Sequence, residues 1–482
     1  MKRSYLVRGL VLSVLAALVM PAAASADIYT SGALPDSVGI NSIWVIVAGV
    51  LVMFMQAGFA FLEIGFSRGK NAGTIIAKIL VNFSIAAILY WAVGFAFAFG
   101  HGNGGNSIIG TTGFFLRDYG DPTNAFPIMG FSDATIEAKF FFQFVFCAVS
   151  LAIVWGTTLE RVKFGVYILY AIVFSTLIYP IASGWVFGGG WLQTNKHLGM
   201  QDFAGSTAVH LIGATGALAA LLHLGPRKGK YTSDGTPRAI PGHNMPLFGL
   251  GIFILWLGWF GFNPGSTLNA LDGRFPEVVL TTNIAAAAGV LFAVATAYWK
   301  TKAIDIGMAG NGAIAGLVAI TAPSGYVMPW AAFVIGAVAG VIVVLGVYAI
   351  DKKVDDPVGA LSAHGLAGIW GTLACGLFTH PDLAAFNTVG KGGLVYTGSF
   401  HQLGVQALGV VVVFAFVFIV SYVTFGIIKA TYGMRVTEEE EDAGLDISEH
   451  GMYGYPEQFI PQSELVGYGG VTPVTPTSEV TA

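Results

Sequence analysis

Long apolar segments separated by short polar stretches fill the chain after residue 26. Each is roughly 18 to 28 residues long, which is about the length a helix needs to cross a bilayer. Their ranges are 41–66, 74–99, 140–158, 164–187, 203–222, 246–263, 278–299, 304–322, 327–350, 361–379 and 402–429. The pattern predicts an all-α polytopic membrane protein with eleven transmembrane helices.

The first 26 residues have a different pattern from these segments. A basic start with Lys2, Arg3 and Arg8 is followed by an apolar middle and the Ala-Ser-Ala sequence at 24–26. This pattern predicts a cleavable signal peptide, with an uncleaved first membrane helix as the alternative. We therefore expect three regions: 1–26 as signal peptide, 27–430 as the membrane domain and 431–482 as a C-terminal tail.

The basic residues give an independent indication of orientation. With the mature N-terminus outside and eleven crossings, the C-terminus is cytoplasmic. Fifteen Lys and Arg residues then fall on the cytoplasmic side, five on the other side and three in the signal peptide, which accounts for all 23. Cytoplasmic loops of membrane proteins carry this excess of positive charge. The asymmetry therefore favours both the span count and the orientation.

Composition agrees with a protein in lipid. Of the 482 residues, 55% are hydrophobic and 10% are charged. Many of the 65 glycines lie inside the segments in small-xxx-small spacing, as at Gly336 and Gly340, which allows helices to approach closely. The two cysteines, Cys147 and Cys375, lie in apolar segments. We expect both to be small buried hydrophobic residues without disulfide or metal chemistry.

Two histidines lie inside apolar segments among small residues. They are His210 in "STAVHLIGATG" of the fifth segment and His364 in "LSAHGLAGIWG" of the tenth. Two five-helix halves of opposite topology would bring them to related places near the bilayer centre. A lone buried histidine is often only packed and hydrogen bonded. Two in matching positions favour a shared site, because neutral imidazole offers one donor and one acceptor.

Charged residues are scarce in the middle of the predicted spans. Glu63 and Lys78 fall near cytoplasmic ends and Asp202 near an extracellular end. This scarcity argues against a carrier with a buried carboxylate relay. Asp202 has two interpretations, as the N-cap of the fifth helix or as a group that helps to recruit substrate. We find no phosphate loop, metal-ligand cluster or activated nucleophile, so we expect no enzyme activity, cofactor or nucleic-acid partner.

Aromatic residues cluster in "KFFFQFVF" (139–146), "GWVFGGGW" (184–191) and "LWLGWFGFNPGS" (255–266). Most aromatic side chains in membrane proteins serve packing or interface anchoring. Ring faces can also hold a small cation, and a hydroxyl such as Ser266 can accept a hydrogen bond from it.

In these stretches the sequence resembles the ammonium transporter family (Amt/Mep/Rh superfamily), over roughly residues 35–460. The resemblance rests on "QAGFAFLEIGFSRGKN" (56–71), "DFAGSTAVH" (202–210), "WFGFNPGS" (259–266), "DDPVGALSAHG" (355–365) and "GMRVTEEEEDAGLDISEHG" (433–451). It implies a homotrimer of eleven-helix subunits, each with its own pore and a five-plus-five inverted repeat.

The resemblance also implies roles for single residues. His210 and His364 match the twin pore histidines, and Asp202 matches the aspartate below the outer vestibule. Ser266 matches the hydroxyl of the external recruitment site. Phe142, Phe146 and Phe262 match the recruitment and gating phenyl rings, and Trp259 matches a tryptophan that lines the pore.

Two positions depart from the family pattern. Phe187 stands where the family often has Trp, and its weaker ring quadrupole should loosen cation binding. Gly359 stands where some members carry an aspartate, five residues before the second pore histidine. The sequence gives no interpretation of this second departure.

These features lead to a mechanistic hypothesis. Ammonium is recruited outside by Phe142, Phe187 and Ser266, and it loses its proton near the phenyl gate, because a low-dielectric pore disfavours the charged form. Ammonia then crosses along His210 and His364, while potassium has no proton to lose. Whether the proton follows separately stays open at this point.

The C-terminal tail suggests regulation. An acidic run such as "TEEEEDAGLD" is commonly only a solvated segment. By resemblance it is a docking surface for a trimeric PII-type nitrogen signal protein, and the last residues have a composition typical of disorder. We expect multi-pass insertion in the cell membrane (inner or plasma membrane). The alternatives are an ammonium sensor, less favoured because no signalling domain follows residue 482, and an Rh-type gas channel.

Overall fold

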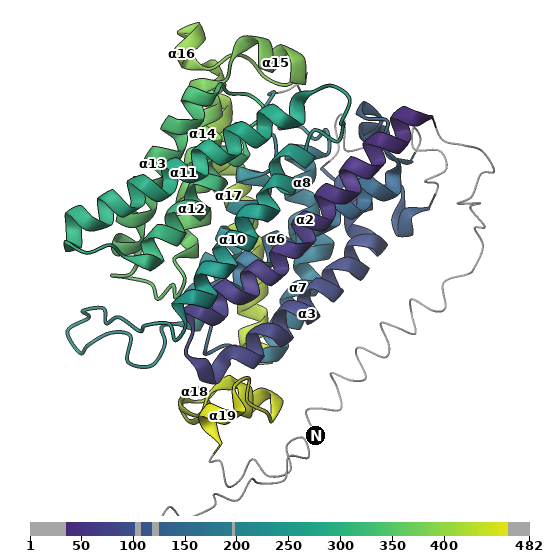
Figure 1. The fold of residues 1–482 in the computed structure, drawn as a ribbon. Coiled ribbons are helices and arrows are strands. Elements are labelled where there is room, and N and C mark those ends of the chain that lie inside the picture. Colours follow the sequence, from purple (N-terminus) through teal and green to yellow (C-terminus); the bar gives the residue numbers. More distant parts are fainter. Residues whose placement is uncertain (1–34, 102–107, 118–124, 195–197, 461–482) are drawn as a thin grey trace, which may run out of the picture.

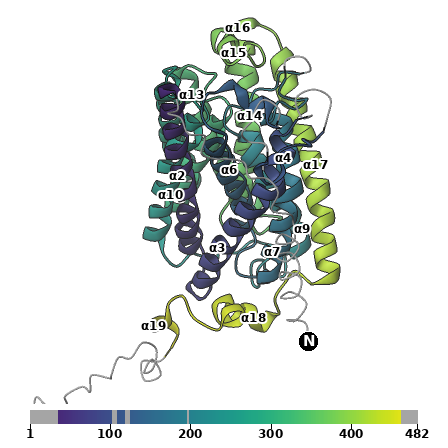
Figure 2. The same ribbon diagram turned by 90° about the vertical axis from the view of Figure 1, so that its right-hand side faces the viewer.

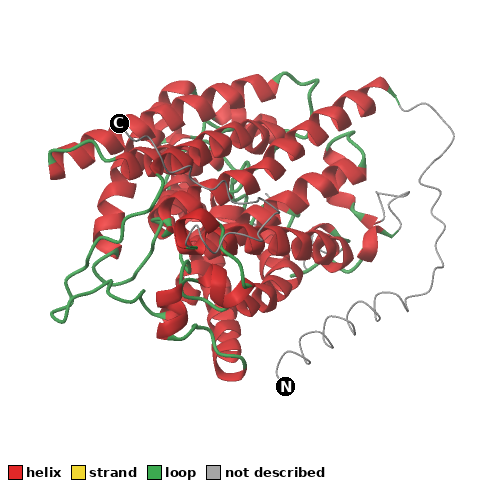
Figure 3. Cartoon of the chain, turned by 60° about the horizontal axis from the view of Figure 1, so that its bottom comes forward, coloured by secondary structure: helices red, strands yellow, loops and turns green. Residues whose placement is uncertain are grey.

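The computed structural model describes residues 35–101, 108–117, 125–194 and 198–460. Within this part of the chain the structure is helical and contains no strand (Figure 3). The predicted signal peptide at 1–26 lies outside the described residues, as do residues 461–482 of the tail. The helices run side by side as one bundle (Figure 1).

The first five spans of the bundle correspond to the first five predicted segments. Span 1 is α2 (Asp36–Phe66), and span 2 is η1 (Gly69–Asn71), α3 (Ala72–Leu89), η2 (Tyr90–Gly94) and α4 (Phe95–Phe99). Span 3 is α6 (Ile136–Gly156). Span 4 is α7 (Phe164–Val173), η5 (Phe174–Ile178) and α8 (Tyr179–Phe187), and span 5 is η6 (Ser206–Leu211) and α9 (Ile212–Leu224).

The later spans also follow the predicted segments. They are α10 (Met245–Gly265), α11 (Arg274–Thr301), α12 (Ile306–Thr321), α13 (Pro329–Ile350), η7 (Leu361–Leu366) with α14 (Ala367–Phe378), and α17 (His401–Thr431). Ten of the described helices are long and apolar enough to cross a membrane, and α12 is the shorter apolar helix. A helix satisfies all its backbone hydrogen bonds internally, which lipid requires. The count of eleven crossings and the orientation stay predictions.

Burial separates central helices from peripheral ones. In α6, 89% of the most apolar 18-residue stretch is buried, whereas in α17 this share is 33%. Figure 2 shows α6 inside the bundle and α17 along its edge. The outward side chains of α17 include Val411, Ile419 and Ile427, which are exposed and apolar, as a lipid-facing surface requires.

Small residues allow the close helix contacts that their spacing predicts. A Cβ atom added to Gly336 of α13 would lie 2.1 Å from the carbonyl oxygen of Ala285 in α11. At Gly340 the corresponding distance to Gly289 O is 2.4 Å. Only glycine permits these approaches, so the two helices pack backbone to backbone.

The tail folds against one end of the bundle. It forms α18 (Glu438–Ala443), η8 (Asp446–His450) and α19 (Pro456–Phe459). The short helices α15 (Pro381–Asn387) and α16 (Leu394–Thr397) lie at the opposite end (Figures 1 and 2). We call the tail end inner and the other end outer, in keeping with the predicted orientation.

Candidate substrate pathway

A cavity of about 650 Å³ occupies the outer end of the bundle. We call it the outer cavity. Its lining includes five of the residues singled out in the sequence: Phe142, Phe146, Phe187, Asp202 and Ser266. They come from spans 3, 4 and 6 and from the segment before span 5. The fold therefore brings the predicted recruitment residues around one space, and Phe187 is among them.

Ser266 lies where α10 ends. Pro264 stands in the last turn of this helix, and Ser266 follows as its C-cap. The Ser266 hydroxyl donates to Phe262 O at 2.8 Å. Because this bond uses the hydroxyl proton, the oxygen lone pairs stay available as acceptors toward the cavity. An acceptor here suits a ligand that donates hydrogen bonds.

Two buried phenyl rings, Phe142 and Phe146, line the outer cavity, and a third, Phe262, packs against Phe146 from outside this lining. The ring centroids of Phe142 and Phe146 lie 4.6 Å apart, and Phe146 stacks on Phe262 at 4.0 Å with an interplanar angle of 17°. All three side chains are buried. A stacked apolar pair offers no ligand oxygen, so a hydrated ion would have to give up its water here without replacement.

The twin histidines lie directly behind this phenyl pair. His210 packs against Phe262 and Trp259 at centroid distances of 5.4 and 5.3 Å. The Nδ1 atoms of His210 and His364 are 3.2 Å apart. Trp259 donates its Nε1–H to Thr321 Oγ1 at 3.0 Å, which fixes its ring beside His210. The two histidines, 154 residues apart in sequence, thus form one site.

The Nδ1 to Nδ1 contact constrains the proton positions of the pair. One Nδ1 must donate and the other must accept, so two neutral rings have opposite tautomers. One Nε2 is then an acceptor and the other a donor. The Nε2 atom of His210 is buried without a hydrogen-bond partner among the described residues. A small solute with both donor and acceptor capacity can satisfy it.

Asp202 caps the fifth span. Its Oδ1 accepts from the backbone N–H groups of Gly205 and Ser206 at 2.8 and 3.0 Å. Its Oδ2 accepts from Thr207 and Ala208, both at 2.9 Å. Burial raises the pKa of Asp202 to about 6, although these four hydrogen bonds act in the opposite direction. Asp202 therefore caps the fifth span. It also lines the outer cavity, so the two predicted roles are compatible with each other.

Asp356 caps the start of span 10, a role that the sequence analysis did not assign. It precedes His364 by eight residues, the same interval that separates Asp202 from His210. Its carboxylate accepts from Gly359 N at 3.0 Å and Leu361 N at 2.7 Å. Burial first, and then the nearby Asp355 charge, raise the pKa of Asp356 to about 6. The equal interval before the two histidines was the signal that could have identified it.

Both histidines lie in a π-helical turn at the start of their span. His210 belongs to η6 and His364 to η7. Such wider turns are rare and often occur at functional sites. The matching cap, turn and histidine in spans 5 and 10 are what two related halves would produce.

The backbone conformation at position 359 explains why glycine is suited to this position. Its φ angle is +75°, and an added Cβ would lie 3.0 Å from Asn311 Nδ2. Glycine adopts this left-handed conformation at no steric cost, and aspartate is among the few other residues found in it. The position therefore requires a backbone shape, which Gly359 supplies.

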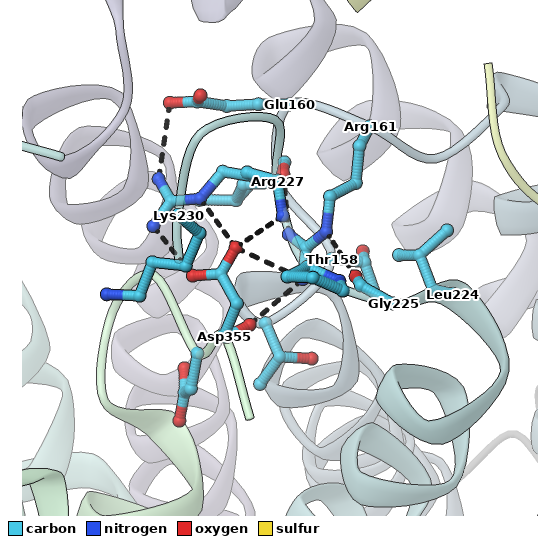
Figure 4. A network of polar contacts seen from close by, with 12 residues as sticks. Thr158, Glu160, Arg161, Leu224, Gly225, Arg227, Lys230 and Asp355 are labelled. Atoms are coloured by element: carbon cyan, nitrogen blue, oxygen red, sulfur yellow. Dashed lines mark hydrogen bonds and ion pairs between the residues drawn. The ribbon is translucent and has the colours of Figure 1, made fainter. Parts of the chain in front are cut away.

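A network of charged groups holds the loop before span 10 (Figure 4). Arg227 donates through Nε and Nη2 to the two oxygens of Asp355, both at 2.9 Å. Arg161 donates through Nη2 to Asp355 O at 2.9 Å, and Glu160 lies 3.7 Å from Arg227. Burial alone would raise the pKa of Asp355, but Arg227 and Arg161 lower it to about 2. This network fixes the chain next to Asp356 and thereby η7.

The cysteines are buried and free, as expected. Across the described ranges no group of three or more His, Cys, Asp or Glu side chains has an arrangement that could hold a metal ion.

These features define a class of protein. A bundle of apolar helices holds a polar and aromatic outer cavity, then stacked phenyl rings and then a buried histidine pair. These features are those of a multi-pass membrane protein.

The chain belongs to the Ammonium Transporter Family, whose profile matches residues 43–455. It is 43% identical over 465 residues to ammonium transporter Amt2 of Archaeoglobus fulgidus, an alignment that covers 94% of this chain and 96% of that protein. It is 35% identical over 422 residues to the ammonium transporter of Bacillus subtilis, covering 87% of this chain and 99% of that one. These relatives are named as transporters and not as enzymes.

Solved structures agree with the family assignment. A structure titled "Sensor Amt Protein" matches with a TM-score of 0.78 at 38% identity, covering 86% of this chain and 99% of that one. The structure of Candida albicans Mep2 matches with a TM-score of 0.74 at 29% identity, covering 83% of this chain and 87% of that one. The fold and the family that the sequence motifs indicate are thus confirmed.

Proposed function

We propose that this protein takes up ammonium across the cell membrane by recruiting the cation in the outer cavity and conducting ammonia past the twin histidines. Membership of the Ammonium Transporter Family and relatives named as ammonium transporters support transport of ammonium. The observation that carries the mechanism is the direct succession of outer cavity, phenyl pair and histidine pair.

The outer cavity is suited to ammonium recruitment. Ammonium can place its charge against the ring faces of Phe142 and Phe187 and donate a hydrogen bond to Ser266. Asp202 adds negative potential when ionised, although its carboxylate is already engaged by four backbone N–H groups. Recruitment thus rests on aromatic and hydroxyl groups more than on a free carboxylate.

The phenyl pair separates ammonium from potassium. Both ions carry one charge, and neither finds ligand oxygens between Phe146 and Phe262. Ammonium can release a proton to water in the outer cavity, where an O–H bond forms as the N–H bond breaks, and continue as neutral ammonia, because a low-dielectric surrounding disfavours the charged form. Potassium cannot. Selectivity therefore follows from acid–base chemistry and not from size.

The histidine pair then carries ammonia through the centre. Ammonia can donate to one imidazole nitrogen and accept from another, which matches the opposite tautomers of the pair. The Nε2 atom of His210 is such a group, because it is buried and has no hydrogen-bond partner among the described residues. Whether the released proton crosses separately decides between electrogenic and electroneutral transport.

Several further properties belong to this proposal. We infer a homotrimer in the cell membrane, a signal peptide at 1–26, a transport domain at 27–430 and a regulatory tail at 431–482 that binds a PII-type signal protein. The exposed apolar residues on the helices at the periphery of the bundle are compatible with both lipid and subunit contacts.

The test uses purified protein in liposomes. An ammonium pulse should produce a transient current or a rise of internal pH, and a potassium pulse should produce neither. A current with ammonium alone would mean that charge follows the ammonia. Alkalinisation without current would mean passage of neutral ammonia. If folded protein gave neither a current nor a change of internal pH, the result would contradict the proposal and favour a sensor.

A further inference from the structure

An ion pair is buried within the membrane-spanning helices. Glu63 of α2 and Lys78 of α3 form a salt bridge, and their side chains are 2% and 1% exposed. Sequence position alone suggested that both fall near cytoplasmic ends, where charges reach water. The structure instead buries them completely. Placing two charges in a low-dielectric interior is costly before their attraction is counted, so such residues in spans commonly serve a function.

One oxygen of the Glu63 carboxylate is engaged by Lys78. The ion pair joins Lys78 Nζ to Oε2, and beyond this pairing neither atom has a hydrogen-bond partner among the described residues. The Lys78 ammonium also lies 5.7 Å from the centre of the Tyr167 ring. The second oxygen, Oε1, points elsewhere: it is 3.6 Å from where a Cβ of Gly156 would be.

Glu63 and Gly156 line a cavity that His364 also lines. This inner cavity has a volume of about 20 Å³, which is room for a single water-sized molecule. Phe59 and Asn311 contribute to its wall, and the centroids of the Phe59 and His364 rings are 6.4 Å apart. Among the described lining residues Glu63 is the only carboxylate, and Lys78 is not part of the lining.

We propose that the Glu63 carboxylate is an inner ammonium site, which receives the substrate after the twin histidines, and that Lys78 weakens this site by compensating its charge. The inference rests on the proposed function. Ammonia that leaves His364 takes a proton from a hydronium ion of cytoplasmic water. A fourth N–H bond forms as one O–H bond breaks. The resulting ammonium donates to Oε1 on the cavity side while Lys78 stays on Oε2.

The chemistry of Lys78 supports this assignment. Its side chain ends in a primary ammonium group, so the structure already shows this carboxylate holding the kind of cation that we assign to it. The cavity approaches the same carboxylate from the other side. A substrate of one nitrogen atom fits the volume, whereas a larger organic cation does not.

The compensation by Lys78 has a transport rationale. A site on a conduction path must be favourable enough to enter and weak enough to leave. A buried carboxylate without a counter-ion would retain any monovalent cation, potassium included. With Lys78 in place the site is neutral overall, and its occupant can leave for the cytoplasm.

The test removes the counter-ion and adds potassium. Wild type, Lys78→Met, Lys78→Arg and the double variant Glu63→Gln/Lys78→Met are reconstituted as full-length protein in liposomes. Ammonium-driven transport is measured with about 100 mM potassium on both sides and again with N-methylglucamine. Symmetric potassium makes the result independent of protein orientation. We expect at least tenfold inhibition of Lys78→Met by potassium and less than twofold inhibition of the other three.

The outcomes separate this inference from the proposed function. No ammonium transport by folded wild type would overturn the proposed function itself. Transport by wild type together with a potassium-insensitive Lys78→Met variant would overturn only the inner site. If Lys78→Met does not fold, Gly156→Ala provides the second test, since its methyl group fills the space beside Oε1. We expect at least threefold slower transport at wild-type yield, and an unchanged rate would overturn the site.

Discussion

Asp202 and Asp356 occupy equivalent places ahead of the two buried histidines, His210 and His364. Each lies eight residues before its histidine, and each accepts backbone N–H groups at the start of the π-helical turn that carries this histidine. A carboxylate that accepts backbone N–H groups fixes the start of a helix. The two caps therefore set where His210 and His364 meet.

The histidine pair should be essential for selective conduction. We expect His210→Ala combined with His364→Ala to slow ammonium transport at least tenfold or to abolish its selectivity over potassium, because ammonia loses its hydrogen-bond partners in the buried centre. Flux in liposomes with ammonium and potassium pulses measures both effects. His223→Ala is a matched control, because His223 lies at the inner end of the same helix and contacts Tyr422 O. Untouched transport and selectivity in the double variant would mean that the histidines only pack.

The pKa of Asp202 predicts a pH effect on stability. Its folded-state pKa of about 6 lies above the usual aspartate value of 3.8, so folding favours the protonated form. The associated stability is present below pH 4 and is lost as the pH rises through 6. The melting temperature of wild type relative to Asp202→Asn should therefore increase when the pH falls from 7 to 5. Calorimetry in detergent at the two pH values measures it.

Ser206→Ala is a suitable control for that comparison, because it changes the same turn without a titrating group. Its difference from wild type should be the same at both pH values. A pH-independent difference between wild type and Asp202→Asn would contradict the pKa of about 6.

Affinity at the outer cavity should depend on the ring at position 187. Phe187→Trp supplies a stronger ring quadrupole, and we expect a KM for ammonium about two- to fivefold lower. Initial rates over a range of ammonium concentrations measure the change. Trp185→Phe is the control, because Trp185 donates its Nε1–H to Ile108 O and is not part of the cavity lining. We expect this variant to have the same KM for ammonium as wild type. A KM unchanged by Phe187→Trp would remove residue 187 from recruitment.

The tail should matter for activity or regulation. Asp446 accepts from Gly73 N and Thr74 N at the start of α3, at 2.9 and 2.8 Å, and Glu441 pairs with Arg435. Deleting the residues beyond Met434 removes the Asp446 and Glu441 contacts, and we expect it to impair transport or the response to a PII-type protein. Flux with and without the added signal protein measures both.

A shorter deletion of residues 461–482 is the matched control, because it leaves the contacts of Asp446 and Glu441 in place. We expect it to behave as wild type. Normal transport and a normal response after the longer deletion would show that the tail is not regulatory.

The sequence by itself determined the helical spans and the residues that we propose for the pathway. Apolar segments of this length have few options in lipid other than a helix, so hydropathy located the helices to within a few residues. His210 and His364 could be recognised because polar side chains are conspicuous in such segments. The motif around Ser266, Phe262 and Trp259 indicated the family, and with it the expected path.

Only the tertiary structure decided which distant groups meet. The Nδ1 contact of His210 and His364 and the burial of Glu63 with Lys78 both depend on how separate helices pack against one another. Hydropathy reports the cost of placing one residue in lipid. It contains no information about the partner that offsets this cost, because that partner is supplied by another helix when the bundle closes.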